Sequence, residues 1–175
     1  LRYHSTETFS SIKTPKMKTY FINLKRDKER WEKVKHMGFE RFEAINGKEL
    51  NKDKLIASKI VSKKNTLKAG QLGCALSHIE VLKKIQRQRE PYGLILEDDV
   101  IIPENFNESM ITIPDTFDIL FLGGCNIKGK RIADNLIKPS NDKRSYNLCL
   151  HAVLVNKNSV AKILKLLTPL YRPID

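Results

Sequence analysis

The sequence predicts an α/β fold with a mainly parallel central sheet flanked by helices, and three observations support this. Short apolar blocks rich in β-branched and aromatic residues alternate along the chain with segments of helical periodicity. Within these blocks the apolar residues are consecutive, which is typical of parallel strands that are covered on both faces. The 175 residues suffice for one domain, and a chain of this size can bury about 70% of its unfolded surface.

The expected elements follow one another in a simple order. The first strand leads into a helix that Asp27 caps and Gly38 ends, and the longest helix ends before Pro91. Asn46-Gly47 indicates a turn after the second strand. We expect loops at 48–68, with weak helical character at 52–58, and at 127–146. Strands are expected at residues 19–24, 39–45, 92–96, 118–122 and 148–155, and helices at 27–37, 69–89 and 159–167.

The charge balance is strongly basic, with 32 Lys and Arg against 20 Asp and Glu and a net charge of +12. The excess is densest at 48–68 and at 128–144. It favours attraction to phosphates, whether of a nucleic acid, an anionic lipid or a nucleotide ligand, and it also fits a solvated lysine-rich surface. No apolar run reaches the roughly 20 residues that a membrane span needs, so only peripheral membrane contact is compatible with the sequence.

Cysteine use and the first residues bear on compartment and domain limits. Cys74, Cys125 and Cys149 form no Cys-x-x-Cys pair and are odd in number, which predicts reduced thiols and a cytoplasmic protein. Residues 1–16 lack the apolar core of a signal peptide and are expected to be a flexible lead-in or a cloning remnant. We therefore expect a single domain at 17–175.

The sharpest chemical feature is the run of three acids, Glu97, Asp98 and Asp99, directly after the expected strand 92–96. Strand alternation places Glu97 and Asp99 on one side and Asp98 on the other. Ligands of open α/β sheets bind beyond the carboxyl ends of strands. Carboxylate oxygens there suit Mg²⁺ or Mn²⁺, which could bridge a diphosphate. The same residues would also suit a solvated acidic turn that ends a strand.

A second candidate segment opens the long helix. Gly70 and Gly73 would let the backbone approach a ligand, and Ser77 and His78 follow one turn later. Cys74 and His78 are four residues apart and share a helix face, but no matching second pair of zinc ligands is present. A packed, hydrogen-bonded histidine is the alternative interpretation.

A third candidate segment follows the first strand. Asn23 and Arg26 lie where a nucleotide at the carboxyl edge of the sheet would first meet the chain, and Arg26 or Arg30 could contact its base or phosphates. An ordinary helix entry with exposed basic residues remains the alternative. Gly123-Gly124 lacks the spacing of a dinucleotide-binding loop.

In order and spacing, a set of segments together resembles glycosyltransferase family 25, which includes bacterial lipooligosaccharide galactosyltransferases and the collagen hydroxylysine galactosyltransferases. The resemblance covers nearly everything from Lys18 onward. It rests on the segments Tyr20-Phe-Ile-Asn-Leu-Lys-Arg-Asp-Lys-Glu-Arg30, Phe42-Glu-Ala-Ile-Asn-Gly47, Ala69-Gly-Gln-Leu-Gly-Cys-Ala-Leu-Ser-His78, Leu94-Ile-Leu-Glu-Asp-Asp-Val100, Phe117-Asp-Ile-Leu-Phe-Leu-Gly123, His151-Ala-Val-Leu-Val155 and Pro173-Ile-Asp175.

The resemblance implies a GT-A-like nucleotide-sugar-binding fold, a UDP-sugar donor (typically UDP-galactose) and a divalent metal, usually Mn²⁺, with Mg²⁺ as the other option. It implies an inverting transfer of a hexose to a hydroxyl of a glycan, lipooligosaccharide or hydroxylysine. By position, Asp99 and Glu97 match the metal-binding acids, with Glu97 near the ribose or a metal-bound water. Asp98 and Asp175 are the candidates for the catalytic base. The donor-binding candidates are Asn23, Arg26, Ser77, His78 and Glu97.

Two departures from the family pattern keep other functions open. Val153 stands where relatives often carry Tyr, and the chain stops at Asp175 where relatives usually continue, so a C-terminal segment is expected to be missing. One alternative is a degenerate family member that acts as a scaffold. Another is a basic nucleic-acid-binding domain, which the low aromatic content and the lack of a recognisable motif disfavour. The sequence names neither the sugar nor the acceptor, nor the oligomeric state.

Overall fold

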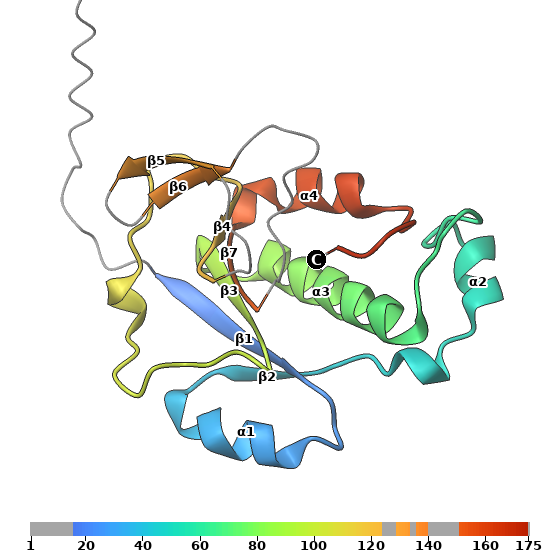
Figure 1. Ribbon diagram of the computed structural model, residues 1–175, viewed down its shortest axis with the longest axis horizontal. Helices are drawn as coiled ribbons and strands as arrows, with labels where there is room; N and C mark the ends of the chain where they lie inside the picture. The colour runs from blue at the N-terminus through green and yellow to red at the C-terminus, as the bar shows by residue number, and fades with distance from the viewer. Residues whose placement is uncertain (1–15, 124–128, 134–135, 140–150, 175) are drawn as a thin grey trace, which may run out of the picture.

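The computed structural model describes residues 16–123, 129–133, 136–139 and 151–174. Its five-stranded central sheet consists of β1 (Met17–Asn23), β2 (Glu40–Glu43), β3 (Tyr92–Glu97), β4 (Ile119–Phe121) and β7 (Ala152–Asn156). Their spatial order is β2-β1-β3-β7-β4 (Figure 1). β1 pairs in parallel with β2 and β3, whereas β7 pairs antiparallel with β3 and β4. Only β7 therefore runs against the other four strands, which confirms the predicted mainly parallel sheet.

Helices cover both faces of this sheet. α3 (Ala69–Arg87) and α4 (Val160–Leu167) lie on one side and α1 (Lys28–Val34) lies on the other (Figure 1). On the α3 and α4 side, Tyr20, Ile95 and Val153 are buried against helix residues that include Ile85 and Ile163. The opposite faces of the same strands are buried beneath α1 and the 100–117 segment, through Phe21, Leu94, Leu96 and Leu154. Two covered faces explain why the strands are apolar at consecutive positions.

Most element boundaries agree with the predicted ones. α1 continues as a 3₁₀ turn, Lys35–Met37, and ends at Gly38, whose φ of 76° suits a residue without a side chain. α2 (Lys52–Ala57) confirms the weak helical signal and is capped by Asn51, whose side chain accepts a hydrogen bond from the Lys54 amide. Strands β2 and β4 are shorter than predicted, and positions 148–150 of the last expected strand lie outside the described residues.

One prediction was wrong. Within 127–146, expected to be a loop, β5 (Gly129–Ala133) and β6 (Leu136–Pro139) pair as an antiparallel hairpin. The loop prediction rested on the polar and basic composition of this segment. The sequence between the two strands, Asp134-Asn135, is of the kind that favours a short hairpin connection. For this segment it is a better indicator of structure than the overall composition.

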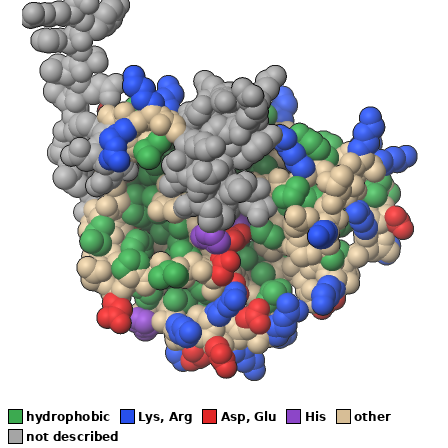
Figure 2. All heavy atoms as spheres, viewed as in Figure 1, with side chains coloured by type: hydrophobic (Ala, Val, Ile, Leu, Met, Phe, Trp, Pro, Cys, Tyr) green, Lys and Arg blue, Asp and Glu red, His purple; other side chains and the backbone are tan. Residues whose placement is uncertain are grey.

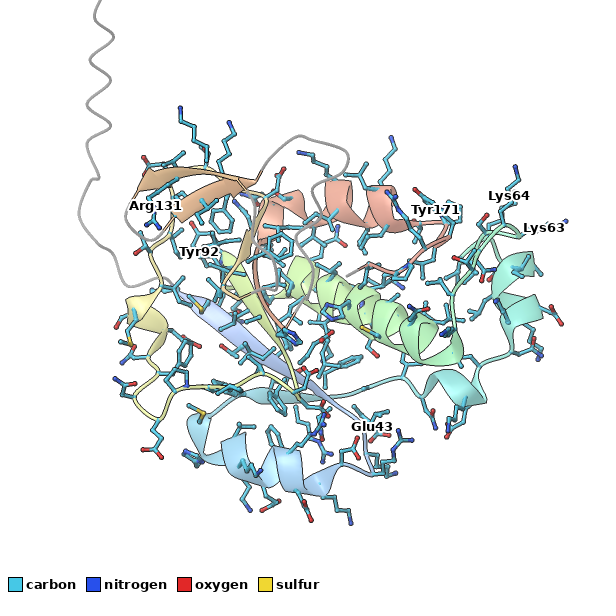
Figure 3. The ribbon with its side chains drawn as sticks, viewed as in Figure 1. Glu43, Lys63, Lys64, Tyr92, Arg131 and Tyr171 are labelled. Carbon is cyan, nitrogen blue, oxygen red and sulfur yellow. The ribbon has the colours of Figure 1, made fainter. Side chains whose placement is uncertain are left out.

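The loop before α3 and the segment after α4 pack around the amino-terminal half of α3. The segment after α4 returns beside the loop that precedes α3, where the Leu170 amide donates to the Ile60 carbonyl at 2.9 Å. Tyr171 lies beside this loop, and the side chains of Lys63 and Lys64 extend outward from it (Figure 3). Among the described residues, no helix is both long and apolar enough to cross a membrane.

Candidate functional site: the carboxyl edge of the sheet

Four chain segments meet at one edge of the sheet because of the strand directions. β1, β2 and β3 are parallel, so Asn23, Glu43 and Glu97, their last residues, lie at the same edge. β7 is antiparallel, so its beginning, with His151 just before it, lies at that edge too. The Glu97 amide donates to the His151 carbonyl at 2.9 Å. Figure 2 shows acidic and histidine side chains gathered near the middle of one face of the molecule.

Glu97, Asp99 and His151 form an outer acidic–histidine set on this edge. His151 Nδ1 lies 3.0 Å from Asp99 Oδ1 and 3.9 Å from Glu97 Oε2. One ligand atom from each residue lies within 4.8 Å of the others. The Asp99 side chain is 50% exposed, so the set is accessible to an incoming ion. Two carboxylates and an imidazole are suitable ligands for Mn²⁺. The predicted metal residues Glu97 and Asp99 therefore fit such an ion, and His151 is a third candidate ligand that sequence analysis did not single out.

The other oxygen of Glu97 faces the long helix. His78 Nε2 lies 2.8 Å from Glu97 Oε1, and Cys74 Sγ donates to the same oxygen at 3.3 Å. The hydrogen bond with His78 lowers the pKa of Glu97 below its usual value, and this outweighs burial, which acts in the opposite direction. Glu97 is thus held as a carboxylate between α3 and β7. His78 is 4% exposed and contacts this carboxylate from the α3 side.

Asp98 lies in the turn that directly follows β3, and its side chain has different partners from those of Glu97 and Asp99. Its Oδ2 accepts a hydrogen bond from Asn23 Nδ2 at 2.8 Å, and its Oδ1 accepts one from an Arg30 guanidinium nitrogen at 2.6 Å. The hydrogen bond to Asp98 raises the pKa of Arg30. Asn23 is fully buried, and its Oδ1 accepts a hydrogen bond from Arg41 at 2.6 Å. Asn23 therefore joins β1, β2 and the acidic segment from inside the protein.

A cavity of about 260 Å³ lies beside Glu97 and Asp99. Its charged border combines the acids with Arg26 and Lys48. Gly70 and Cys74 from α3 line it too, as do residues of the 44–47 segment. Positive and negative groups thus meet around one hollow at the carboxyl edge of the sheet, which is where α/β folds bind ligands.

The 45–47 turn is fitted tightly onto α3. A Cβ on Gly73 would lie 2.5 Å from the Ile45 carbonyl oxygen, and one on Gly47 would lie 1.7 Å from the Ala69 carbonyl oxygen. Ser77 Oγ accepts a hydrogen bond from the Ile45 amide at 2.8 Å and donates to the Gly73 carbonyl at 2.7 Å. The expectation that Gly73 admits a ligand was wrong, because the space beside it is filled by the backbone of the turn.

The predicted site residues divide into three groups. Glu97, Asp98 and Asp99 lie together, and Arg26 is exposed at the cavity. Ser77, Asn23 and His78 are buried, and their side chains bond to other parts of the chain. Asp175 lies outside the described residues. Sequence reasoning missed the place of His151 and Lys48 at this site. The expected strand 148–155 included His151, whereas β7 begins at Ala152 and leaves His151 at its entry.

Comparison with known proteins gives consistent results. Residues 16–126, more than half of the chain, match the model of glycosyltransferase family 25, described as LPS biosynthesis protein. The chain is 30% identical over 113 residues to a human protein named procollagen galactosyltransferase 2, an alignment covering 57% of this chain and 18% of the relative. It is 27% identical over 143 residues to a Drosophila melanogaster glycosyltransferase 25 family member, covering 67% and 23%.

The aligned part therefore spans about a fifth of the length of these relatives. The matched residues include β1, α3, β3 and the acidic run Glu97-Asp98-Asp99, so the agreement lies in the part of the chain that builds the carboxyl edge. The fold, the acidic edge and the family match agree, and the chain belongs to glycosyltransferase family 25.

Proposed function

We propose that the protein is a metal-dependent glycosyltransferase that moves galactose from UDP-galactose to a hydroxyl group, with inversion at the anomeric carbon. The observation that carries this proposal is the convergence of Glu97, Asp99 and His151 beside a cavity bordered by Arg26 and Lys48. The name of the human relative supports galactose as the sugar and procollagen as one acceptor class. The family description supports a lipooligosaccharide or another glycan as the alternative acceptor.

Each group at this edge has a distinct task in the proposal. Glu97, Asp99 and His151 would hold Mn²⁺ or Mg²⁺, which when bound supplies positive charge to the departing diphosphate. Arg26 and Lys48 line the same cavity and would add positive charge to a diphosphate bound there. Preorganised charge of this kind is usually the largest contribution to such a reaction.

Asp98 is better suited to positioning than to proton transfer. Both of its oxygens accept hydrogen bonds, one from buried Asn23 and one from Arg30, so neither oxygen is left without a protein partner. These bonds fix the backbone of the acidic segment between its two flanking metal-binding residues. Asp175 stays the predicted base for the acceptor hydroxyl, a role that contributes roughly 10²–10⁴-fold in such reactions.

A thermal-shift screen of nucleotide sugars, with and without Mn²⁺, tests this proposal. Ligand at 100 times its dissociation constant stabilises a native protein by about 2.7 kcal/mol, which for a domain of this size raises the unfolding midpoint by roughly 5–10 °C. We expect that shift for UDP-galactose with Mn²⁺, a smaller one for UDP-glucose, and none for GDP-sugars. Absence of any Mn²⁺-dependent shift with UDP-sugars would overturn the proposal. DNA binding that weakens steeply with salt would then favour the nucleic-acid alternative.

A further inference from the structure

Glu97 is shared between two different groups of metal-binding side chains. Its Oε2 faces His151, whereas its Oε1 faces Cys74 and His78 on α3. Ligand atoms of Cys74, His78 and Glu97 lie within 4.8 Å of one another. This inner Cys–His–Glu group is separate from the outer set in every residue except the carboxylate that both use.

The distances in the inner group are close to those around one tetrahedral ion. Zinc binds thiolate sulfur at about 2.3 Å and imidazole nitrogen or carboxylate oxygen at about 2.0–2.2 Å, so neighbouring ligand atoms are roughly 3.3–3.6 Å apart. The observed separations are 3.3 Å for Cys74 Sγ to Glu97 Oε1 and 2.8 Å for His78 Nε2 to the same oxygen. The first separation suits two ligands of one ion, whereas binding would require His78 Nε2 to move about 0.5 Å further from this oxygen and to exchange its hydrogen bond for the ion.

The helix contributes to the preorganisation of this group. Cys74 and His78 are four residues apart on α3, so both side chains lie on one face, one turn apart. His78 is 4% exposed and packed in the helix–sheet core, which restricts its ring. Cys74 and Glu97 line the cavity, so an ion held by the three residues would keep an open fourth position toward it.

We propose that Cys74, His78 and Glu97 form a binding site for a thiolate-seeking divalent ion, Zn²⁺. Ligand softness separates it from the outer set: thiolate with imidazole selects zinc, whereas carboxylates with water suit Mn²⁺ and Mg²⁺. Because Glu97 belongs to both groups, zinc in the inner site would bind the same carboxylate that a metal in the outer site would bind. The proposal does not depend on the transferase activity.

Cobalt substitution tests this site directly in the full chain under reducing conditions. Co²⁺ bound to a thiolate gives an intense near-ultraviolet charge-transfer band. We expect one equivalent of Co²⁺ to produce the band, one equivalent of Zn²⁺ to remove it, and Cys74→Ser to abolish it. The double variant Cys125→Ser/Cys149→Ser and the outer-set variant Asp99→Asn keep the band. Loss of the thiolate should raise the zinc dissociation constant by more than about 100-fold, which exceeds the effect of losing a residue that only hydrogen-bonds to a ligand.

A second measurement on the unaltered chain avoids any effect of substitution on folding. One equivalent of Zn²⁺ should slow alkylation of Cys74 by iodoacetamide, measured by mass spectrometry of the peptide that contains it, whereas Mg²⁺ should leave the rate unchanged. A cobalt band that persists in Cys74→Ser, no band in the unaltered chain, or equal alkylation rates with and without zinc would each overturn the proposal. None of these experiments uses a nucleotide sugar, so their failure leaves the proposed transferase function untouched.

Discussion

Asp99→Asn is expected to remove Mn²⁺-dependent binding of UDP-galactose, with an affinity loss of at least about 100-fold. The substitution keeps the size of the side chain but removes a negative charge from the outer acidic–histidine set, where Asp99 lies 3.0 Å from His151. Loss of a residue that only hydrogen-bonds to a metal ligand costs about 10–100-fold in metal affinity, so loss of a ligand should cost more. Isothermal titration calorimetry of UDP-galactose with and without Mn²⁺ measures the effect.

The matched control is Asp115→Asn, an exposed acid on the 100–117 segment that the structure places outside the cavity lining. It removes the same charge and should leave donor affinity unchanged. Both variants should unfold within about 0.5 kcal/mol of the unaltered chain, because both side chains are at the surface. Normal Mn²⁺-dependent binding by Asp99→Asn would contradict the assignment of Asp99 to the metal.

Gly73→Ala is expected to lower the free energy of unfolding by about 2 kcal/mol, although alanine is the better helix former. Helix propensity favours the change by about 1 kcal/mol. Against this, the new Cβ would lie 2.5 Å from the Ile45 carbonyl oxygen and 2.7 Å from the Gly47 amide nitrogen. Both are backbone atoms, so the turn must move and weaken the Ser77–Ile45 hydrogen bond; overpacking of this kind costs about 1–3 kcal/mol, occasionally more. Urea denaturation measures the loss.

Gly70→Ala, three residues earlier on the same helix, separates the gain in helix propensity from the steric clash. A Cβ at Gly70 meets no atom within 4 Å. Only the backbone effect remains there, and the expected result is a gain of about 0.5–1 kcal/mol. If both variants were stabilised alike, the tight fit of the 45–47 turn onto α3 would be disproved.

The arrangement of the strands was predictable where local signals agreed. Consecutive apolar residues in β1 and β3 indicated strands buried on both faces, and Gly38 marked the end of the first helical segment. The antiparallel direction of β7 was not predictable, because strand direction depends on the path of the chain between elements. The β5–β6 hairpin was hidden by its basic residues, which carry no periodic signal.

The candidate site was only partly predictable from the sequence, because several of its contacts join residues that are far apart in the chain. Alternation predicted different partners for Asp98 than for Glu97 and Asp99, and the contacts do differ. The cause is a turn, because β3 ends at Glu97 and both aspartates follow it. The burial of Asn23 and Ser77 was not foreseen, because their partners, Asp98 and Ile45, are distant in sequence. His151 is brought to Glu97 only by the reversed direction of β7. Contacts of this kind cannot be predicted from the local sequence pattern, because they depend on the tertiary fold.

Pulsed electron paramagnetic resonance of Mn²⁺ bound together with UDP tests the central claim most directly, because it reports the nuclei next to the ion. We expect nitrogen coupling from His151 and phosphorus coupling from the diphosphate in the unaltered chain. The nitrogen coupling should disappear in His151→Asn and persist in His36→Asn, a change at a histidine outside the outer set. A bound Mn²⁺ signal with no phosphorus coupling, or with nitrogen coupling that survives in His151→Asn, would contradict a metal–diphosphate site at the carboxyl edge of the sheet.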